Sequence, residues 1–85
     1  MELYKINIKK DAEKELKSLH KQDLKRIVEK IQSLASNPRP MGCQKLKGDE
    51  GYRVRQGDFR VVYHISDAEK IVRIIRIGHR REVYH

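Results

Sequence analysis

Three arginines, Arg53, Arg55 and Arg60, lie within the segment 52–63, which reads YRVRQGDFRVVY. Its first half alternates apolar or amphipathic residues with Arg53 and Arg55, a period of two that is typical of a strand with one buried and one open face. Gly57-Asp58 suits a type II′ turn, because glycine adopts the positive φ that the first turn position requires. Aromatic and β-branched residues after the turn favour a second strand. The segment is therefore predicted to be a β-hairpin.

The predicted turn fixes the register of this hairpin. Arg55 would pair with Arg60, and Arg53 with Val62. Because paired residues lie on the same face of a sheet, the three arginines would share one face. Like charges directly opposite one another destabilise a hairpin, so we expect this face to bind an anion. The planar fork of a guanidinium group matches phosphate in a way that lysine cannot copy, which favours phosphate as that anion.

Composition narrows the class of partner. The 85 residues carry a formal net charge of +8, which favours nucleic acid first and an anionic membrane surface second. All arginines except Arg26 lie at position 39 or later, so they concentrate in the predicted strands. No apolar run approaches the roughly 20 residues of a membrane span, and no signal-peptide core is evident. Cys43 is the only cysteine, which excludes an internal disulfide and argues against a thiolate metal site. We expect a cytoplasmic protein of one domain, residues 1–85, without metal or cofactor.

Hydrophobic spacing predicts the remaining elements. In chain order they are a strand over 3–8, a helix from Asp11 to about His20, a longer helix from Asp23 to Asn37-Pro38, a loop over 38–51, the hairpin extended through Ile65, and a strand over 71–77. The order βααβββ favours an α+β domain with an antiparallel sheet. A helical hairpin would cover one face of that sheet and leave the other face open and basic.

The register of the last strand follows from the polar turn before it. If Ile65 pairs with Ile71, Arg60 faces Arg76, and Arg76 joins the arginine face. Arg73 would then point to the apolar face, where it would extend its guanidinium group to solvent or pair with an acid. The uncovered, basic sheet surface that results could admit a nucleic-acid strand.

Two stretches, LKGDEGYRVRQGDFRVVY at 46–63 and IGHRREVY at 77–84, resemble the RelE-type toxins of bacterial toxin–antitoxin systems, within the RelE/ParE superfamily. The order of elements matches as well. The resemblance implies a RelE-like fold and a metal-independent endoribonuclease, an mRNA interferase, that enters the A site of the 30S subunit and inhibits translation. There the 2′-OH of the mRNA attacks the adjacent phosphate. This reaction needs a base, cations for the developing charge, and an acid for the leaving oxygen.

The resemblance also implies roles for individual residues. Arg53 and Arg55 fall where well-known members carry two lysines with base or charge-stabilising roles. Arg60 matches an arginine that stabilises the transition state. Arg80 matches an arginine associated with protonation of the leaving group, and Tyr84 a tyrosine that stacks on or orients the substrate base.

The departure from lysine puts the identity of the base in question. Arginine has a pKa above about 12 and is a poor base near neutral pH, so either electrostatics carries most of the rate or another group is the base. His79 is the natural candidate, because histidine titrates in this range, whereas His64, near the far end of the arginine face, is expected to be structural or solvated. The predicted catalytic residues are Arg55, Arg60, His79, Arg80 and Tyr84. The predicted RNA and phosphate contacts are Lys45, Lys47, Arg53, Arg76 and Arg81.

Two other functions stay open. A ParE-like inhibitor of DNA gyrase would share the fold but bind a protein. A degenerate toxin would bind antitoxin without catalysis, which the loss of both family lysines could produce. The expected partners are the ribosome, mRNA and an acidic, partly disordered antitoxin that neutralises the arginine face.

Overall fold

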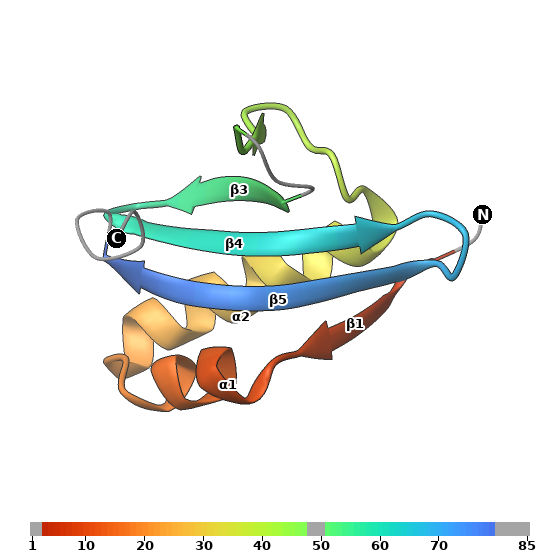
Figure 1. The fold of residues 1–85 in the computed structure, drawn as a ribbon. Coiled ribbons are helices and arrows are strands. Elements are labelled where there is room, and N and C mark those ends of the chain that lie inside the picture. The colour runs from red at the N-terminus through yellow and green to blue at the C-terminus, as the bar shows by residue number, and fades with distance from the viewer. Residues whose placement is uncertain (1–2, 48–50, 80–85) are drawn as a thin grey trace.

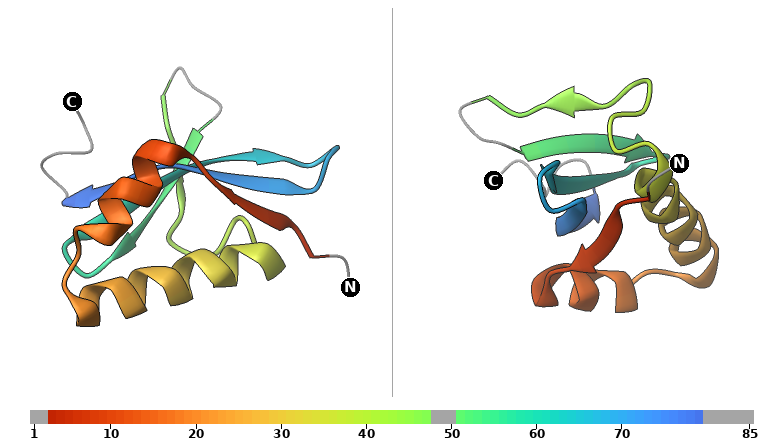
Figure 2. Two further views of the ribbon diagram at one scale, coloured as in Figure 1. Left: turned by 90° about the horizontal axis from the view of Figure 1, so that it is seen from below. Right: turned by 90° about the vertical axis from the view of Figure 1, so that its right-hand side faces the viewer.

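The computed structural model describes residues 3–47 and 51–79. Its elements are β1 (Lys5–Ile8), α1 (Lys10–Lys17), α2 (Lys21–Ser36), β2 (Gln44–Lys45), β3 (Gly51–Gln56), β4 (Phe59–Ser66) and β5 (Ile71–His79). The strands form one sheet in the order β1-β5-β4-β3-β2. In the view of Figure 1, α2 lies behind this sheet and α1 lies below β5, and Figure 2 shows the same layers from two further sides. The predicted α+β class and its helical layer are confirmed.

Two features of the sheet differ from the predicted antiparallel arrangement. β1 pairs with β5 in parallel, with Lys5 beside Ile71 and Ile8 beside Ile74, so the sheet is mixed. A parallel neighbour needs a long connection, which the helices and the remaining strands supply, but hydrophobic spacing carries no information on strand direction. In addition, the predicted loop 38–51 contains β2, which pairs with β3.

Both helices begin earlier than predicted. Lys9 and His20 occupy the N-cap positions of α1 and α2, and neither helix has a side-chain capping hydrogen bond. Asp11 and Asp23, where the helices were predicted to begin, lie in the first turns instead, where a carboxylate interacts favourably with the helix dipole. An aspartate is favourable both at the N-cap and in the first turn of a helix, so the sequence alone does not fix the residue at which each helix begins. α2 ends at Ser36, as the following Asn37-Pro38 predicts.

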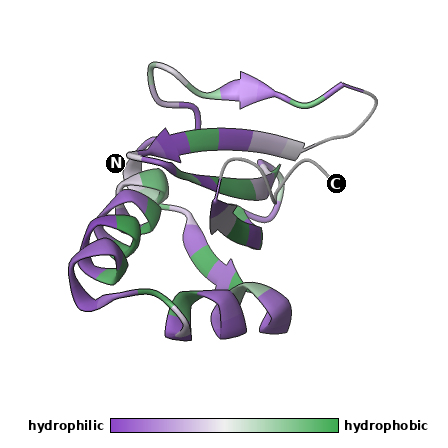
Figure 3. Ribbon diagram, turned by 90° about the vertical axis from the view of Figure 1, so that its left-hand side faces the viewer, coloured by the Kyte–Doolittle hydropathy of each residue, from purple (hydrophilic) through white to green (hydrophobic). Residues whose placement is uncertain are grey.

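The core fills the space between the helices and the sheet. Tyr63, at its centre, is completely buried and donates a hydrogen bond from its hydroxyl group to the carbonyl oxygen of Pro38 at 2.7 Å, which satisfies the buried polar group. Hydrophobic and hydrophilic bands alternate along the strands in Figure 3, as expected for a sheet with one buried face. The other buried apolar side chains are Ala12, Leu16, Ile27, Ile31, Leu34, Val54, Val61, Val72, Ile74 and Ile77.

The predicted register between the last two strands is wrong. The pairs Ile65–Ile71 and Arg60–Arg76 do not form, and Arg60 pairs with Gly78 instead. The turn between these strands is longer than a two-residue hairpin loop, so sequence alone does not fix where the pairing begins.

A β-bulge in β5 is a second difference from the predicted β4–β5 register. Val62 pairs with Arg76, but Tyr63 pairs with Ile74, so Ile75 is an extra residue in β5. A bulge interrupts the alternation of side chains along its strand. The residues of β5 before the bulge therefore lie on the faces opposite to those predicted, and Arg73 lies with its partner His64 on the open side of the sheet.

Candidate nucleic-acid interface

We define the open face as the sheet surface that carries Arg53, Arg55 and Arg60. It is built by the β3–β4 hairpin, whose register is confirmed: Arg55 pairs with Arg60 and Arg53 with Val62. Gly57 has a φ of +62°, which fits the predicted turn. Directly opposite residues have Cβ atoms roughly 4.5–5.5 Å apart. The structure therefore brings cationic side chains together on neighbouring strands.

Arg53 shows the electrostatic consequence of this arrangement. Burial lowers the pKa of its guanidinium group, and the charge of Arg55 lowers that pKa further. Gln44 of β2 lies directly opposite Arg53 and accepts a hydrogen bond from its guanidinium group. β2, which the sequence did not reveal, therefore helps to position this side chain. An anion bound between the arginines would relieve the repulsion between them.

Arg60 is the buried charge of the open face. It is 5% exposed, and no other charged residue in the described ranges is buried. Its partner on β5 is Gly78, which is also buried. Charge interactions are stronger where water is excluded. An anion that reaches Arg60 is therefore held more firmly than one at an exposed lysine.

Arg76 belongs to the same face by pairing, but its side chain reaches towards α1. Its guanidinium group lies 3.4 Å from one carboxylate oxygen of Glu15, and the backbone N–H of Ile77 donates to the other oxygen at 2.9 Å. Glu15 thus accepts a hydrogen bond from a backbone N–H group at the edge of β5, beyond the end of β1. It also offsets the charge of Arg76. A phosphate contact by Arg76, as predicted, would have to compete with this carboxylate.

His79 lies on the other face of the sheet from the hairpin arginines. It pairs with Phe59, and the two rings meet at 75° with centroids 5.9 Å apart. With Asp23 and Arg26 of α2, His79 lines a cavity of about 330 Å³. The structure therefore does not bring the predicted base together with the arginines, because residue 79 alternates with residue 78 across the sheet.

The remaining predicted site residues divide into two groups. Lys45 and Lys47 are exposed. Lys45 pairs with Tyr52, so it lies on the face of the sheet opposite to Gln44 and Arg53. Arg80, Arg81 and Tyr84 lie outside the described residues, and their roles stay predictions.

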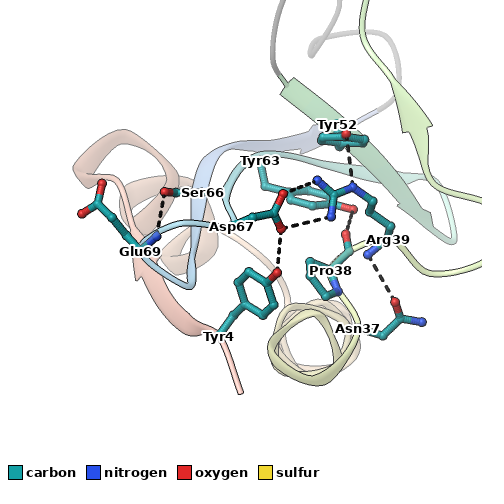
Figure 4. Close-up of polar contacts among 9 residues, drawn as sticks. All are labelled: Tyr4, Asn37, Pro38, Arg39, Tyr52, Tyr63, Ser66, Asp67 and Glu69. Carbon is teal, nitrogen blue, oxygen red and sulfur yellow. Dashed lines mark hydrogen bonds and ion pairs between the residues drawn. The ribbon is translucent and has the colours of Figure 1, made fainter. Parts of the chain in front are cut away.

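A polar cluster that the sequence did not reveal fixes the far end of the sheet (Figure 4). The two terminal nitrogens of Arg39 donate to the carboxylate of Asp67 at 3.2 and 2.9 Å. Tyr4 donates to the same carboxylate at 2.6 Å, and the Nε of Arg39 donates to the Tyr52 hydroxyl oxygen at 3.3 Å. The cluster links the loop after α2 to β3 and to the β4–β5 turn. Its contacts join residues 28 and 63 positions apart, which no local pattern signals.

This cluster has a clear effect on ionisation. The hydrogen bond from Arg39, followed by that from Tyr4, lowers the pKa of Asp67 to about 2. The same pairing raises the pKa of Arg39. Both groups therefore stay charged across the neutral range and hold the turn in place.

Within residues 3–47 and 51–79, no group of three or more His, Cys, Asp or Glu side chains is arranged to hold a metal ion. None of the helices described there is long and apolar enough to cross a membrane.

Comparison with known proteins decides the family. A family model described as the ParE toxin of the type II toxin–antitoxin system parDE matches residues 6–84. A relative from Methanocaldococcus jannaschii named as toxin RelE1 is 39% identical over 85 residues, covering 95% of this chain and 94% of the relative. The chain belongs to the RelE/ParE superfamily of type II toxins. The resemblance seen in the sequence is thereby confirmed.

Solved structures agree with this assignment. The RelE–RelB complex of Pyrococcus horikoshii contains a chain that is 31% identical, with a TM-score of 0.83 and coverage of 95% of this toxin and 99% of that chain. The RelBE2 complex of Mycobacterium tuberculosis gives 26% identity, a TM-score of 0.82, and coverage of 92% and 99%. The RelE-like fold predicted for this toxin is confirmed.

Proposed function

We propose that this toxin is a ribosome-dependent endoribonuclease that cuts mRNA in the A site and so inhibits translation. In the proposed reaction the 2′-OH attacks the adjacent phosphate, the P–O5′ bond breaks, and the products are a 2′,3′-cyclic phosphate and a 5′-hydroxyl. The observation that carries the proposal is the pairing of Arg55 with Arg60 on the open face, with Arg53 on the same face.

These arginines fit the charge that develops in such a reaction. The pentacoordinate phosphorus gathers negative charge on its non-bridging oxygens, and fixed donors aimed at that charge lower the barrier. Arg55 and Arg60 project from neighbouring strands of a rigid hairpin, so little reorganisation is needed. Removal of one such donor in an enzyme site typically costs about 10²–10³ in rate.

We do not assign the proton transfers of this reaction to the hairpin arginines. A guanidinium group stays protonated near neutral pH, so Arg53, Arg55 and Arg60 act by charge and position rather than as bases. His79 lies on the opposite face, so we do not assign it the 2′-OH proton. Electrostatic stabilisation and positioning by the open face are proposed to supply most of the rate.

We also propose a cognate acidic antitoxin as the cellular partner. The two solved relatives described above are toxin–antitoxin complexes, RelBE2 and RelE–RelB. With its net charge of +8, this toxin would attract an acidic chain that covers the arginines and blocks RNA. The cytoplasm, where ribosomes and mRNA are found, is the proposed location.

The test uses purified ribosomes programmed with a defined mRNA. After addition of the toxin, the 5′ ends of the mRNA are mapped by primer extension, with a reaction lacking ribosomes as control. Discrete cuts within A-site codons that require ribosomes support the proposal. Intact mRNA with normal translation overturns it.

A second candidate is inhibition of DNA gyrase, which the ParE description of the matching family favours. A supercoiling and DNA-cleavage assay with purified gyrase separates the two functions. Gyrase-dependent DNA breaks together with intact mRNA would establish the second candidate in place of the first.

A further inference from the structure

The open face continues well beyond the hairpin arginines, into a row of residues that the sequence did not single out for RNA binding. Asn7 of β1 pairs with Arg73 of β5, Arg73 pairs with His64 of β4, and His64 pairs with Gly51 of β3. We call these four residues the distal row. Since paired residues share a face and Gly51 alternates with Arg53, the distal row lies on the open face.

The distal row borders a hollow of defined composition. A cavity of about 380 Å³ is lined by Asn7, His64, Ser66, Glu69 and Arg73, together with Ile65 and Ile71. It therefore offers a guanidinium donor, a carboxylate acceptor, and amide, imidazole and hydroxyl groups within one small space. This mixture is unlike the hairpin end of the face, where the named groups are cationic.

Two local contacts shape this cavity. A Cβ atom at Gly51 would lie 3.2 Å from the imidazole carbon Cδ2 of His64, so the absence of a side chain there lets the ring lie close over β3. The backbone N–H of Glu69 donates to the hydroxyl oxygen of Ser66 at 3.3 Å, which fixes the start of the β4–β5 turn. Figure 4 shows the carboxylate of Glu69 pointing away from the Arg39–Asp67 cluster.

The position of the row relative to Arg60 suggests what it binds. His64 is four residues from Arg60 on β4, which corresponds to about 13 Å along an antiparallel strand. Arg53 lies between the two ends of the face. A nucleic-acid strand lying along β3 and β4 from Arg55 and Arg60 therefore reaches the distal row within a few nucleotides.

We infer that the cavity beside the distal row binds a ribonucleotide unit of the same RNA strand, with Arg73 on a phosphate and the carboxylate of Glu69, which lines the same cavity, on a ribose 2′-OH. Phosphate oxygens only accept hydrogen bonds, which matches the guanidinium group of Arg73. A 2′-OH can donate one, which gives the carboxylate of Glu69 a favourable partner in a basic surface and distinguishes RNA from DNA. This inference rests on the proposed function, because it extends the RNA path of the same face.

The experiment measures binding separately from cleavage. Fluorescence anisotropy records the Kd of the toxin for a labelled single-stranded RNA and for DNA of the same sequence over a range of KCl concentrations, and a gel verifies that the RNA stays intact. The variants are Arg73→Gln, Arg73→Lys and Glu69→Gln. Arg26→Gln, an exposed arginine of α2 on the helical side, is the matched control.

We expect Arg73→Gln to weaken binding of RNA and DNA about fivefold and to reduce the slope of log Kd against log salt by about 0.7, the value for one phosphate contact on a single strand. Arg73→Lys keeps the slope. Glu69→Gln keeps the slope and reduces the preference for RNA over DNA. Arg26→Gln changes neither quantity.

Equal behaviour of Arg73→Gln and wild type, or a wild type that does not bind RNA, would overturn the inference. The outcome is distinguishable from failure of the proposed function. A wild type that binds RNA through Arg73 but leaves ribosome-bound mRNA intact overturns the nuclease and keeps the distal site. If the wild type cuts mRNA and Arg73→Gln binds and cuts equally well, the distal site is overturned and the nuclease is kept.

Discussion

At the scale of single residues, the sequence predicted the hairpin arginines better than the histidine. Arg53, Arg55 and Arg60 share a face because a two-residue turn at Gly57-Asp58 leaves one register for the strands. His79 was assigned as the base because histidine as a residue type titrates near neutral pH, and residue type does not determine the face on which a side chain lies. Its pairing with Phe59 places it on the helical side.

This placement makes a prediction for His79→Ala. Because general bases contribute about 10²–10⁴ in rate, loss of the base would reduce cleavage by at least that lower figure. We expect the variant to cut ribosome-bound mRNA within about tenfold of wild type, measured as a single-turnover rate. A loss of 10²-fold or more with unchanged stability would show that His79 takes part in the reaction after all.

At the scale of elements, the hairpin turn supports the arginine face. Gly57 has a φ of +62°, and a Cβ atom built there meets nothing within 4 Å, so a side chain at this position would be disfavoured by backbone conformation alone. Gly57→Ala is expected to reduce the free energy of unfolding by roughly 1–2 kcal/mol, measured by urea denaturation. Gly57→Asn is the matched control, because asparagine tolerates the left-handed region. Equal losses in the two variants would contradict this explanation.

The Arg39–Asp67 cluster makes a prediction about pH. The folded pKa of Asp67, about 2, lies below its ordinary value of 3.8, so the ionised carboxylate stabilises the fold above pH 4 and this contribution is lost as the pH falls towards 2. Wild type should therefore lose more stability than Asp67→Asn between pH 4 and pH 2, and the gap between them should be constant at higher pH. Urea denaturation at several pH values measures the difference. Parallel curves throughout the acid range would contradict the role given to Asp67.

The pairing of β4 with β5 could not be predicted from the sequence. The longer turn at 67–70 left the β4–β5 register open, and the bulge at Ile75 shifted the faces of the residues before it. Arg73 consequently lies on the open face rather than the apolar one. No residue from 71 to 77 is a glycine or a turn former, so the sequence carried no local signal of the bulge.

At the scale of the whole molecule, the order of elements was predictable because two amphipathic helices and alternating strands have distinct hydrophobic periods. The parallel pairing of β1 with β5 and the contacts of Arg39 with Asp67 were not predictable, because they join segments far apart in the chain. The resulting molecule places its helices on one side of the sheet and the three hairpin arginines on the other, where Arg55 is exposed and Arg60 is buried. The proposed activity depends on that separation, since an RNA strand needs an uncovered surface.

The most direct test of catalysis by the open face is the rate at which Arg55→Gln cuts mRNA on purified ribosomes under single-turnover conditions. Arg55 is exposed, so the variant should fold normally, and Arg26→Gln removes an equal charge from the helical side as a control. We expect about a 10²-fold lower rate for Arg55→Gln and an unchanged rate for Arg26→Gln. Equal rates in both variants, or cleavage by neither these variants nor the wild type, would contradict the claim that the open face performs the reaction.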